Sequence, residues 1–214
     1  MRRCGSATVI AILCGVALAA CGSDRGPGET VGTAQRIEIP GAGEALIWGE
    51  GSQGVVLAHG AAFDAASWES EAEAIAEQGN LVLAVEQIGP EEILAAVEFL
   101  RDERSAERVA LIGASAGADS SLQALVGDPR AVDQLTTLSV NSTAEGIGEQ
   151  PKLFIASEDE GAASLSTELA ASSDGDDNEA LLLPGSAHAQ GIFEGGAGTA
   201  ALEAILDRLA PGVG

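Results

Sequence analysis

The segment Arg108–Gly117 reads RVALIGASAG, a run of apolar residues that leads directly into the pattern G-x-S-x-G around Ser115. Apolar residues at helical spacing, Leu122, Leu125 and Val126, follow among small residues. This order predicts a buried strand, a sharp turn and a helix. Such a turn lifts a serine Oγ clear of the sheet, and its glycines let strand and helix pass closely. With 28 glycines in the chain the pattern alone is a weak signal, so its context carries the prediction that Ser115 is a nucleophile.

Strand patterns alternate with helix patterns along the rest of the chain. Eight strands are expected, at residues 35–39, 45–48, 55–58, 81–85, 109–112, 135–140, 152–156 and 180–183. Most are apolar throughout, as is typical of strands buried on both faces. The alternation predicts an α/β fold with a mostly parallel central sheet of about eight strands and helices on both faces. The first two strands, joined by a Pro-Gly turn, are expected to pair antiparallel.

Three helices have clear boundary signals. Ser67 is a candidate N-cap for a helix that ends at Gly79, and Trp68 on its apolar face is interpreted as a core residue. Pro90 suits the first position of a second helix, and acidic residues follow it in the first turn. Residues Leu202–Leu209 predict a last amphipathic helix.

The two histidines and one acidic cluster follow other strands of the predicted sheet. His59 closes the strand 55–58, and His188 follows the strand 180–183 on a loop of small residues. Between Ser115 and His188, the strand 152–156 leads into three consecutive acids at 158–160. The order serine, acid, histidine is that of the α/β-hydrolases, and the carboxyl ends of parallel strands share one edge of a sheet.

This ordered set resembles that of a small α/β-hydrolase, closest in character to compact dienelactone-hydrolase-like serine esterases. The resemblance runs from about Val55 to Leu209 and implies an α/β-hydrolase fold without a sizeable lid. It rests on His59-Gly60, Ser67-Trp68, Gly113–Gly117, the acid after Ile155 and Gly185–His188. It implies a serine hydrolase that cleaves a small carboxylic ester through an acyl-enzyme, with no cofactor.

The resemblance also implies a role for each residue of the set. Ser115 is the expected nucleophile, and His188 the expected base and then acid. The family's register favours Glu160 as the acid that orients the imidazole, with Asp159 as the alternative. The backbone N–H groups of Ala61 and Ala116 are the expected oxyanion hole. His59 is interpreted as a structural hydrogen-bonding residue beneath that loop.

The N-terminus has the layout of an export signal. Two arginines precede the mostly apolar segment 7–20, which is too short for a transmembrane helix. Its end, Leu18-Ala-Ala-Cys21, resembles the lipobox of bacterial lipoproteins, in which the cysteine carries the lipid. We therefore expect residues 1–20 to be a signal peptide, 21–34 a flexible tether and 35–214 one hydrolase domain. This predicts an exported protein anchored through Cys21 to the extracytoplasmic face of a cell membrane.

Composition narrows the classes of partner. Loss of Arg2 and Arg3 with the signal would take the formal net charge from −23 to −25, which argues against nucleic acid and anionic lipid as partners. The sequence does not support a metal site, because its two histidines are far apart and it has no cysteine pair. It also does not support a nucleotide site, because no glycine-rich nucleotide motif follows a strand. Two alternatives stay open: a thioesterase or amidase with the same groups, and a catalytically silent lipoprotein that uses the fold as a binding module.

Overall fold

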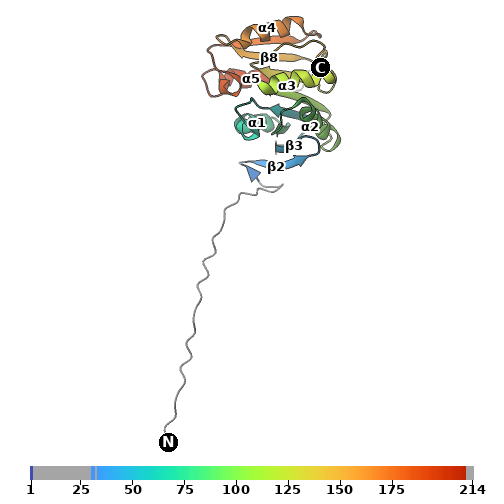
Figure 1. The fold of residues 1–214 in the computed structure, drawn as a ribbon, viewed down its shortest axis with the longest axis vertical. Coiled ribbons are helices and arrows are strands. Elements are labelled where there is room, and N and C mark those ends of the chain that lie inside the picture. Colours follow the sequence, from blue (N-terminus) through green and yellow to red (C-terminus); the bar gives the residue numbers. More distant parts are fainter. Residues whose placement is uncertain (2–29, 32, 211–214) are drawn as a thin grey trace.

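The computed structural model describes residue 1, residues 30–31 and residues 33–210. The predicted signal peptide after Met1 and the predicted lipid site at Cys21 lie outside this part of the chain. Among the described residues, no helix is both long and apolar enough to cross a membrane. The described chain forms one twisted sheet with helices packed against it (Figure 1).

The sheet has nine strands in the order β1-β2-β3-β5-β4-β6-β7-β8-β9. Strand β1 pairs with β2, β2 with β3 and β3 with β5, all antiparallel. From β5 onward in this order, including β4, all neighbouring strands run parallel. The strands are β1 Thr30–Val31, β2 Ala34–Ile39, β3 Gly43–Trp48, β4 Gln53–Ala58, β5 Leu81–Val85, β6 Arg108–Ala114, β7 Gln134–Leu138, β8 Lys152–Ser157 and β9 Asn178–Leu183. The predicted mostly parallel sheet is confirmed, including its antiparallel start.

Helices cover both faces of the sheet. The helices are α1 Glu69–Glu77, α2 Pro90–Asp102, α3 Ala116–Gly127, α4 Ala162–Ser172 and α5 Gly198–Leu209, with short 3-10 helices η1 Ala65–Trp68 and η2 Ala189–Ile192. Helices α2, α3 and α4 pack into one apolar cluster, whereas η1, α1, η2 and α5 pack into a second. Alternate residues of β4, such as Val56 and Leu57, enter the two clusters, so these clusters lie on opposite faces.

The start of the domain differs from the prediction. Strand β1 pairs Thr30 with Gln35 and Val31 with Ala34, and Ala34 is buried in the second cluster. The sheet therefore begins inside the segment 21–34 that was predicted to be a tether. Strand β1 could not be predicted because it has only two residues, which pair through their backbones and are too few to show an apolar periodicity.

The cap of the first helical segment also differs from the prediction. Asp64, not Ser67, is the N-cap, because its carboxylate accepts a hydrogen bond from the Ser67 backbone N–H at 3.0 Å. Ser67 lies inside η1, and α1 begins at Glu69. Trp68 is 1% exposed and stacks edge-on against Phe193, as expected of a core residue.

The only lysine of the described chain is buried at the start of β8. The Lys152 ammonium donates hydrogen bonds to the backbone oxygens of Gln150 and Asp174 and to Asn178 Oδ1. Burial lowers the pKa of this ammonium, and the Asp174 and Glu149 carboxylates partly offset that shift. Three acceptors thus satisfy a charge that would otherwise be costly inside the protein.

The turn at Ser115, between β6 and α3, depends on two close approaches of the backbone. A Cβ at Gly117, in the first turn of α3, would lie 2.3 Å from the backbone oxygen of Ala58 in β4. A Cβ at Gly113, near the end of β6, would lie 2.6 Å from the backbone oxygen of Gly117. Both glycines are therefore required because helix and strands pass without space for a side chain.

This close passage predicts a difference between two glycines of the same helix. We expect Gly117→Ala to lower the free energy of unfolding by about 1–3 kcal/mol or more, because the new Cβ meets backbone atoms that cannot move aside. Gly127→Ala is the matched control, since a Cβ there meets nothing within 4 Å, and its effect should stay below about 1 kcal/mol. Urea denaturation of both variants measures the difference, and equal stability would contradict the packing argument.

Candidate active site

Ser115 lies on the turn between β6 and α3 in a strained backbone conformation. Its φ of 50° and ψ of −113° lie in a region that non-glycine residues rarely occupy. The backbone compensates, because the Ser115 N–H donates to the Leu138 oxygen at 2.8 Å and its oxygen accepts from Asp119 N at 3.0 Å. The hydroxyl is therefore presented at the carboxyl edge of the sheet, as the sequence predicts.

His188 lies between Ser115 and Glu160. Its Nε2 is 2.8 Å from Ser115 Oγ, and its Nδ1 is 2.7 Å from Glu160 Oε2. The His188 side chain is 48% exposed, whereas that of Glu160 is 8% exposed. A carboxylate only accepts hydrogen bonds, so it places the proton of a neutral ring on Nδ1 and leaves Nε2 free to accept the serine proton.

The structure places Glu160, and not Asp159, against the histidine. Glu160 Oε1 accepts hydrogen bonds from Ser139 Oγ at 2.7 Å and from Ser157 N at 2.8 Å, which leaves Oε2 for His188. Asp159 is exposed, and its backbone N–H donates to Gly185 O. The three donors around Glu160 hold a nearly buried carboxylate in one orientation.

Ser139 joins the acid to the loop that carries His188 (the histidine loop), and no sequence pattern indicated this role. The Ser139 hydroxyl donates to Glu160 Oε1 and accepts a hydrogen bond from Ala189 N at 2.8 Å. The strand was predicted to continue to Val140, but β7 ends at Leu138 because Ser139 turns with a φ of 55°. One buried hydroxyl thus fixes the acid and the residue after His188 relative to each other.

The histidine loop is held on both sides of His188. Ser157 Oγ donates to the backbone oxygen of Ala187 at 2.6 Å. After the histidine, Gln190 Oε1 accepts from Gly60 N at 2.8 Å, and its Nε2 donates to Ser67 Oγ. Gln190, whose role no sequence pattern indicated, therefore ties the histidine loop to the loop after β4.

The loop after β4 comes close to Ser115. A Cβ at Gly60 would lie 3.5 Å from Ser115 Cβ. Within the described residues, no hydrogen bond occupies the backbone N–H of Ala61 or of Ala116. His59 lies under this loop, with Nδ1 2.8 Å from the Gly60 oxygen and Nε2 3.1 Å from the Glu86 oxygen. These contacts involve the backbone only, which fits a structural residue.

Asn141 adds an amide beside Ser115. Its Nδ2 donates to Ser115 Oγ at 3.3 Å and to Asp119 Oδ2 at 3.0 Å. Asp119 Oδ1 also accepts from Asn141 N and from Ser142 Oγ. The first turn of α3 therefore holds the loop after β7 against Ser115. No local sequence pattern indicated this contact, because only the fold brings residues 119 and 141 together.

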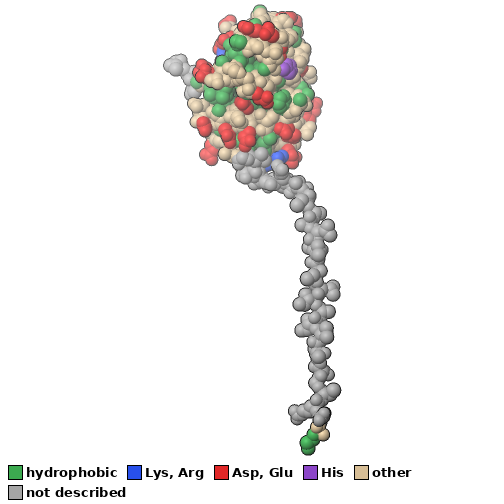
Figure 2. All heavy atoms as spheres, turned by 90° about the vertical axis from the view of Figure 1, so that its left-hand side faces the viewer, with side chains coloured by type: hydrophobic (Ala, Val, Ile, Leu, Met, Phe, Trp, Pro, Cys, Tyr) green, Lys and Arg blue, Asp and Glu red, His purple; other side chains and the backbone are tan. Residues whose placement is uncertain are grey.

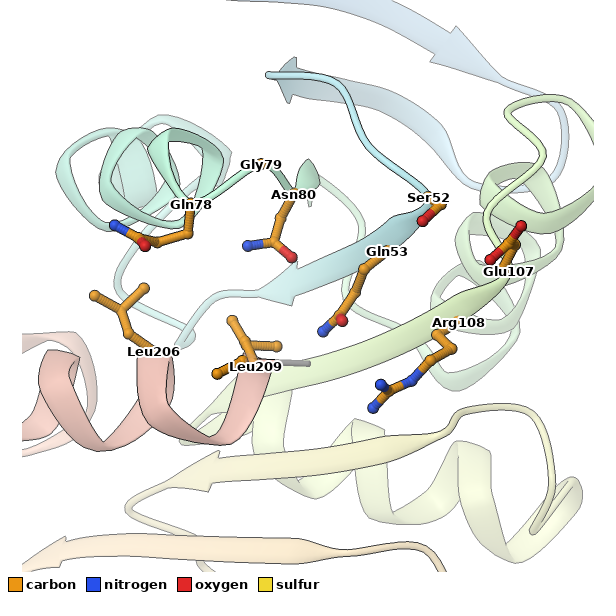
Figure 3. Close-up of a pocket in the computed structure, with 10 residues that line it drawn as sticks. Ser52, Gln53, Gln78, Gly79, Asn80, Glu107, Arg108, Leu206 and Leu209 are labelled. Carbon is orange, nitrogen blue, oxygen red and sulfur yellow. The ribbon is translucent and has the colours of Figure 1, made fainter. Parts of the chain in front are cut away.

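The described residues provide no metal site, and the cavity drawn in Figure 3 lies away from Ser115, His188 and Glu160. In the described part of the chain, no group of three or more His, Cys, Asp or Glu side chains could hold a metal ion. The cavity in Figure 3, of about 370 Å³, is lined by Gln53, Arg108 and Leu209 among others. Gln53 and Arg108 begin β4 and β6, so the cavity lies at the edge of the sheet opposite Ser115.

Comparison with solved structures identifies the fold. A dienelactone hydrolase from Anabaena variabilis matches with a TM-score of 0.66 at 17% identity, over 82% of this chain and 96% of that one. A serine hydrolase without a lid from Xanthomonas campestris matches with a TM-score of 0.61 at 14% identity, over 86% and 99%. A monoacylglycerol lipase from Paleococcus ferrophilus matches with a TM-score of 0.66 at 14% identity, over 77% and 97%.

The class of fold is shown by these structural neighbours and not by sequence. No protein-family model and no curated protein sequence matches this chain. The chain nevertheless has the α/β-hydrolase fold, and its structural neighbours include esterases, lipases and dienelactone hydrolases. The described residues add no lid-like extra segment to that fold, in agreement with the prediction.

The position of the carboxylates predicts a difference between two neighbouring acids. In an assay of ester hydrolysis, Glu160→Gln should lower kcat by on the order of 10³-fold or more, because an amide there can donate to Nδ1 and favour the wrong tautomer. Asp159→Asn is the matched control and should change kcat less than about threefold, since its side chain makes no contact with His188. A larger loss in Asp159→Asn would overturn this assignment of the acid.

Proposed function

We propose that this protein is a serine hydrolase that cleaves carboxylic esters through an acyl-enzyme. The observation that carries the proposal is the continuous hydrogen-bonded chain Ser115–His188–Glu160, with contacts of 2.8 and 2.7 Å. Nucleophile and base lie within hydrogen-bond reach, and a third group orients the base, as nucleophilic catalysis requires.

Each residue of this chain has a defined step. His188 Nε2 takes the Ser115 proton as Oγ attacks the ester carbon, and Glu160 stabilises the imidazolium that forms. The unoccupied N–H groups of Ala61 and Ala116 are the proposed donors to the oxygen of the tetrahedral intermediate. The imidazolium then protonates the leaving alcohol, and water attacks the acyl-enzyme by the same route to release the acid.

The neighbours support this class of reaction. The solved structures of similar fold include proteins named as esterases, a lipase and a dienelactone hydrolase. A thioester or an amide would react at the same groups. The choice of a carboxylic ester therefore rests on the exposed site and on the activities in the names of these neighbours. The exposed imidazole favours a small ester that reaches Ser115 directly from solvent.

A silent binding module is the alternative from another class, and the hydrogen-bond geometry favours catalysis over it. Strain at Ser115 and burial of the Glu160 carboxylate both carry a cost in stability. A binding surface has no need of either feature. The strained elbow and the buried acid have a clear purpose only where the serine hydroxyl is activated.

Removal of the nucleophile tests the proposed function. Ser115→Ala should retain the fold, while ester turnover should fall by on the order of 10³-fold or more because no atom remains to form the acyl-enzyme. A fluorophosphonate should label the unaltered protein at Ser115 and leave Ser115→Ala unlabelled. Ser120→Ala, which changes a serine in the same helix, is the matched control and should be labelled normally. Absence of labelling in the unaltered protein would favour the silent module.

We further propose that the hydrolase is exported and anchored through a lipid on Cys21 to the extracytoplasmic face of a cell membrane. The support is in the sequence: a basic start, an apolar segment and the stretch Leu18-Ala-Ala-Cys21. When the full chain is expressed in a bacterium, Cys21→Ser should move most of the protein out of the membrane fraction. Cys14→Ser, within the predicted signal, is the matched control, and equal membrane retention of both variants would contradict the anchor.

A further inference from the structure

The carboxylate of Asp119 lies beside the proposed nucleophile. One amide nitrogen, Asn141 Nδ2, bridges the two groups, at 3.0 Å from Asp119 Oδ2 and 3.3 Å from Ser115 Oγ. The other donors to Asp119 are Asn141 N and Ser142 Oγ, at 2.9 and 3.1 Å. All of these donors are neutral, so they fix the carboxylate in place without cancelling its charge. The hydrogen-bond partners of the Asp119 carboxylate beside Ser115 therefore include no cation.

The cations of the described chain lie elsewhere. Six of its seven Lys and Arg side chains come from segments at the amino ends of the parallel strands, the edge opposite Ser115. They are Arg101, Arg104, Arg108, Arg130, Lys152 and Arg208. Arg108 lies at the start of β6 and Ser115 follows its end, so the length of the strand separates them. That length is about 20 Å at 3.3 Å per residue.

The seventh cation does not reach the site either. Arg36 lies on β2, on the antiparallel flank of the sheet, and forms an ion pair of 3.0 Å with Glu44. Among the described residues, no Lys or Arg forms an ion pair or hydrogen bond with Ser115, Asp119 or Glu160. Figure 2 shows a face of the molecule on which acidic side chains are widespread and basic ones few.

We propose that the site hydrolyses esters that carry no negative charge near the scissile bond, and that it selects neutral and cationic substrates over substrates with a carboxylate. This inference rests on the proposed function and names its substrate class. A substrate carboxylate near Ser115 would lie within a Debye length of Asp119, and among the described residues no Lys or Arg pairs with Ser115 or Asp119 to offset the repulsion. The formal charge of −23 on the whole chain also opposes the approach of an anion.

Three chromogenic esters with one leaving group test this selectivity. They are the p-nitrophenyl esters of adipamic acid, of adipic acid with its free carboxylate, and of 6-(trimethylammonio)hexanoic acid. The acyl chains have similar length, so the comparison isolates charge. At low ionic strength we expect kcat/KM for the neutral ester to exceed that for the anionic ester by about tenfold or more. The cationic ester should react at least as well as the neutral one.

Two further measurements assign the selectivity to Asp119. The neutral-to-anionic ratio should fall severalfold in Asp119→Asn, and in the unaltered protein it should fall on addition of 0.5 M NaCl, because salt screens the repulsion. If the substitution also displaced the loop that contains Asn141, kcat/KM would fall for both esters, and the ratio between them would not change. Asp128→Asn is the matched control, since it removes an equal charge nine residues along the chain at the other end of α3 and should leave the ratio nearly unchanged.

The outcomes separate the two proposals. Equal kcat/KM for the anionic and neutral esters, or a ratio that neither salt nor Asp119→Asn changes, would overturn the selectivity while leaving the hydrolase function intact. An equal change in Asp128→Asn would overturn its assignment to Asp119. Failure to hydrolyse any of the three esters, together with no fluorophosphonate labelling, would instead refute the hydrolase function and this inference with it.

Discussion

The rest of the structure depends on the close passage of α3 over the ends of β4 and β6. Backbone atoms of Gly117 and Ala58 approach so nearly that a single Cβ has no place between them. This contact fixes where α3 begins, and therefore fixes the direction in which the Ser115 hydroxyl points. It also brings the loop after β4, with Gly60 and Ala61, against the nucleophile. A shift of α3 by even the width of a methyl group would move Ser115 away from the loop after β4, because packed interiors transmit such changes.

A second constraint holds the acid and the base together across three strands. Glu160 follows β8, His188 follows β9 and Ser139 follows β7, and one serine hydroxyl contacts both loops. Hydrogen bonds of this kind gain strength where the surroundings are dry, and Ser139 is fully buried. The imidazole can remain exposed to substrate because its support is buried. The arrangement thus combines an accessible base with a rigid orientation.

Charge is distributed unequally over this frame. The carboxyl edge of the parallel strands holds Glu160 and Asp119, and the amino edge holds most of the cations, including the buried Lys152. Three cations at the amino edge have polar partners there: Arg101 pairs with Asp133, Arg208 with Asp177, and Lys152 donates to backbone oxygens. These contacts contribute to packing and stability away from Ser115. This unequal distribution is the basis of the proposed preference for neutral and cationic substrates over anionic ones.

The sequence by itself determined the sheet, the nucleophile turn and the order of the site residues. These follow from local chemistry: apolar runs of strand length, glycines around Ser115, and two histidines that each follow a strand. It left Glu160 and Asp159 open, because a difference of one residue on a loop has no local signature. Only the tertiary structure placed Glu160 against His188, and only it revealed Ser139, Asn141 and Gln190. Their contacts span 21 to 130 positions along the chain, and such contacts are set by the packing of strands and helices rather than by neighbours in sequence.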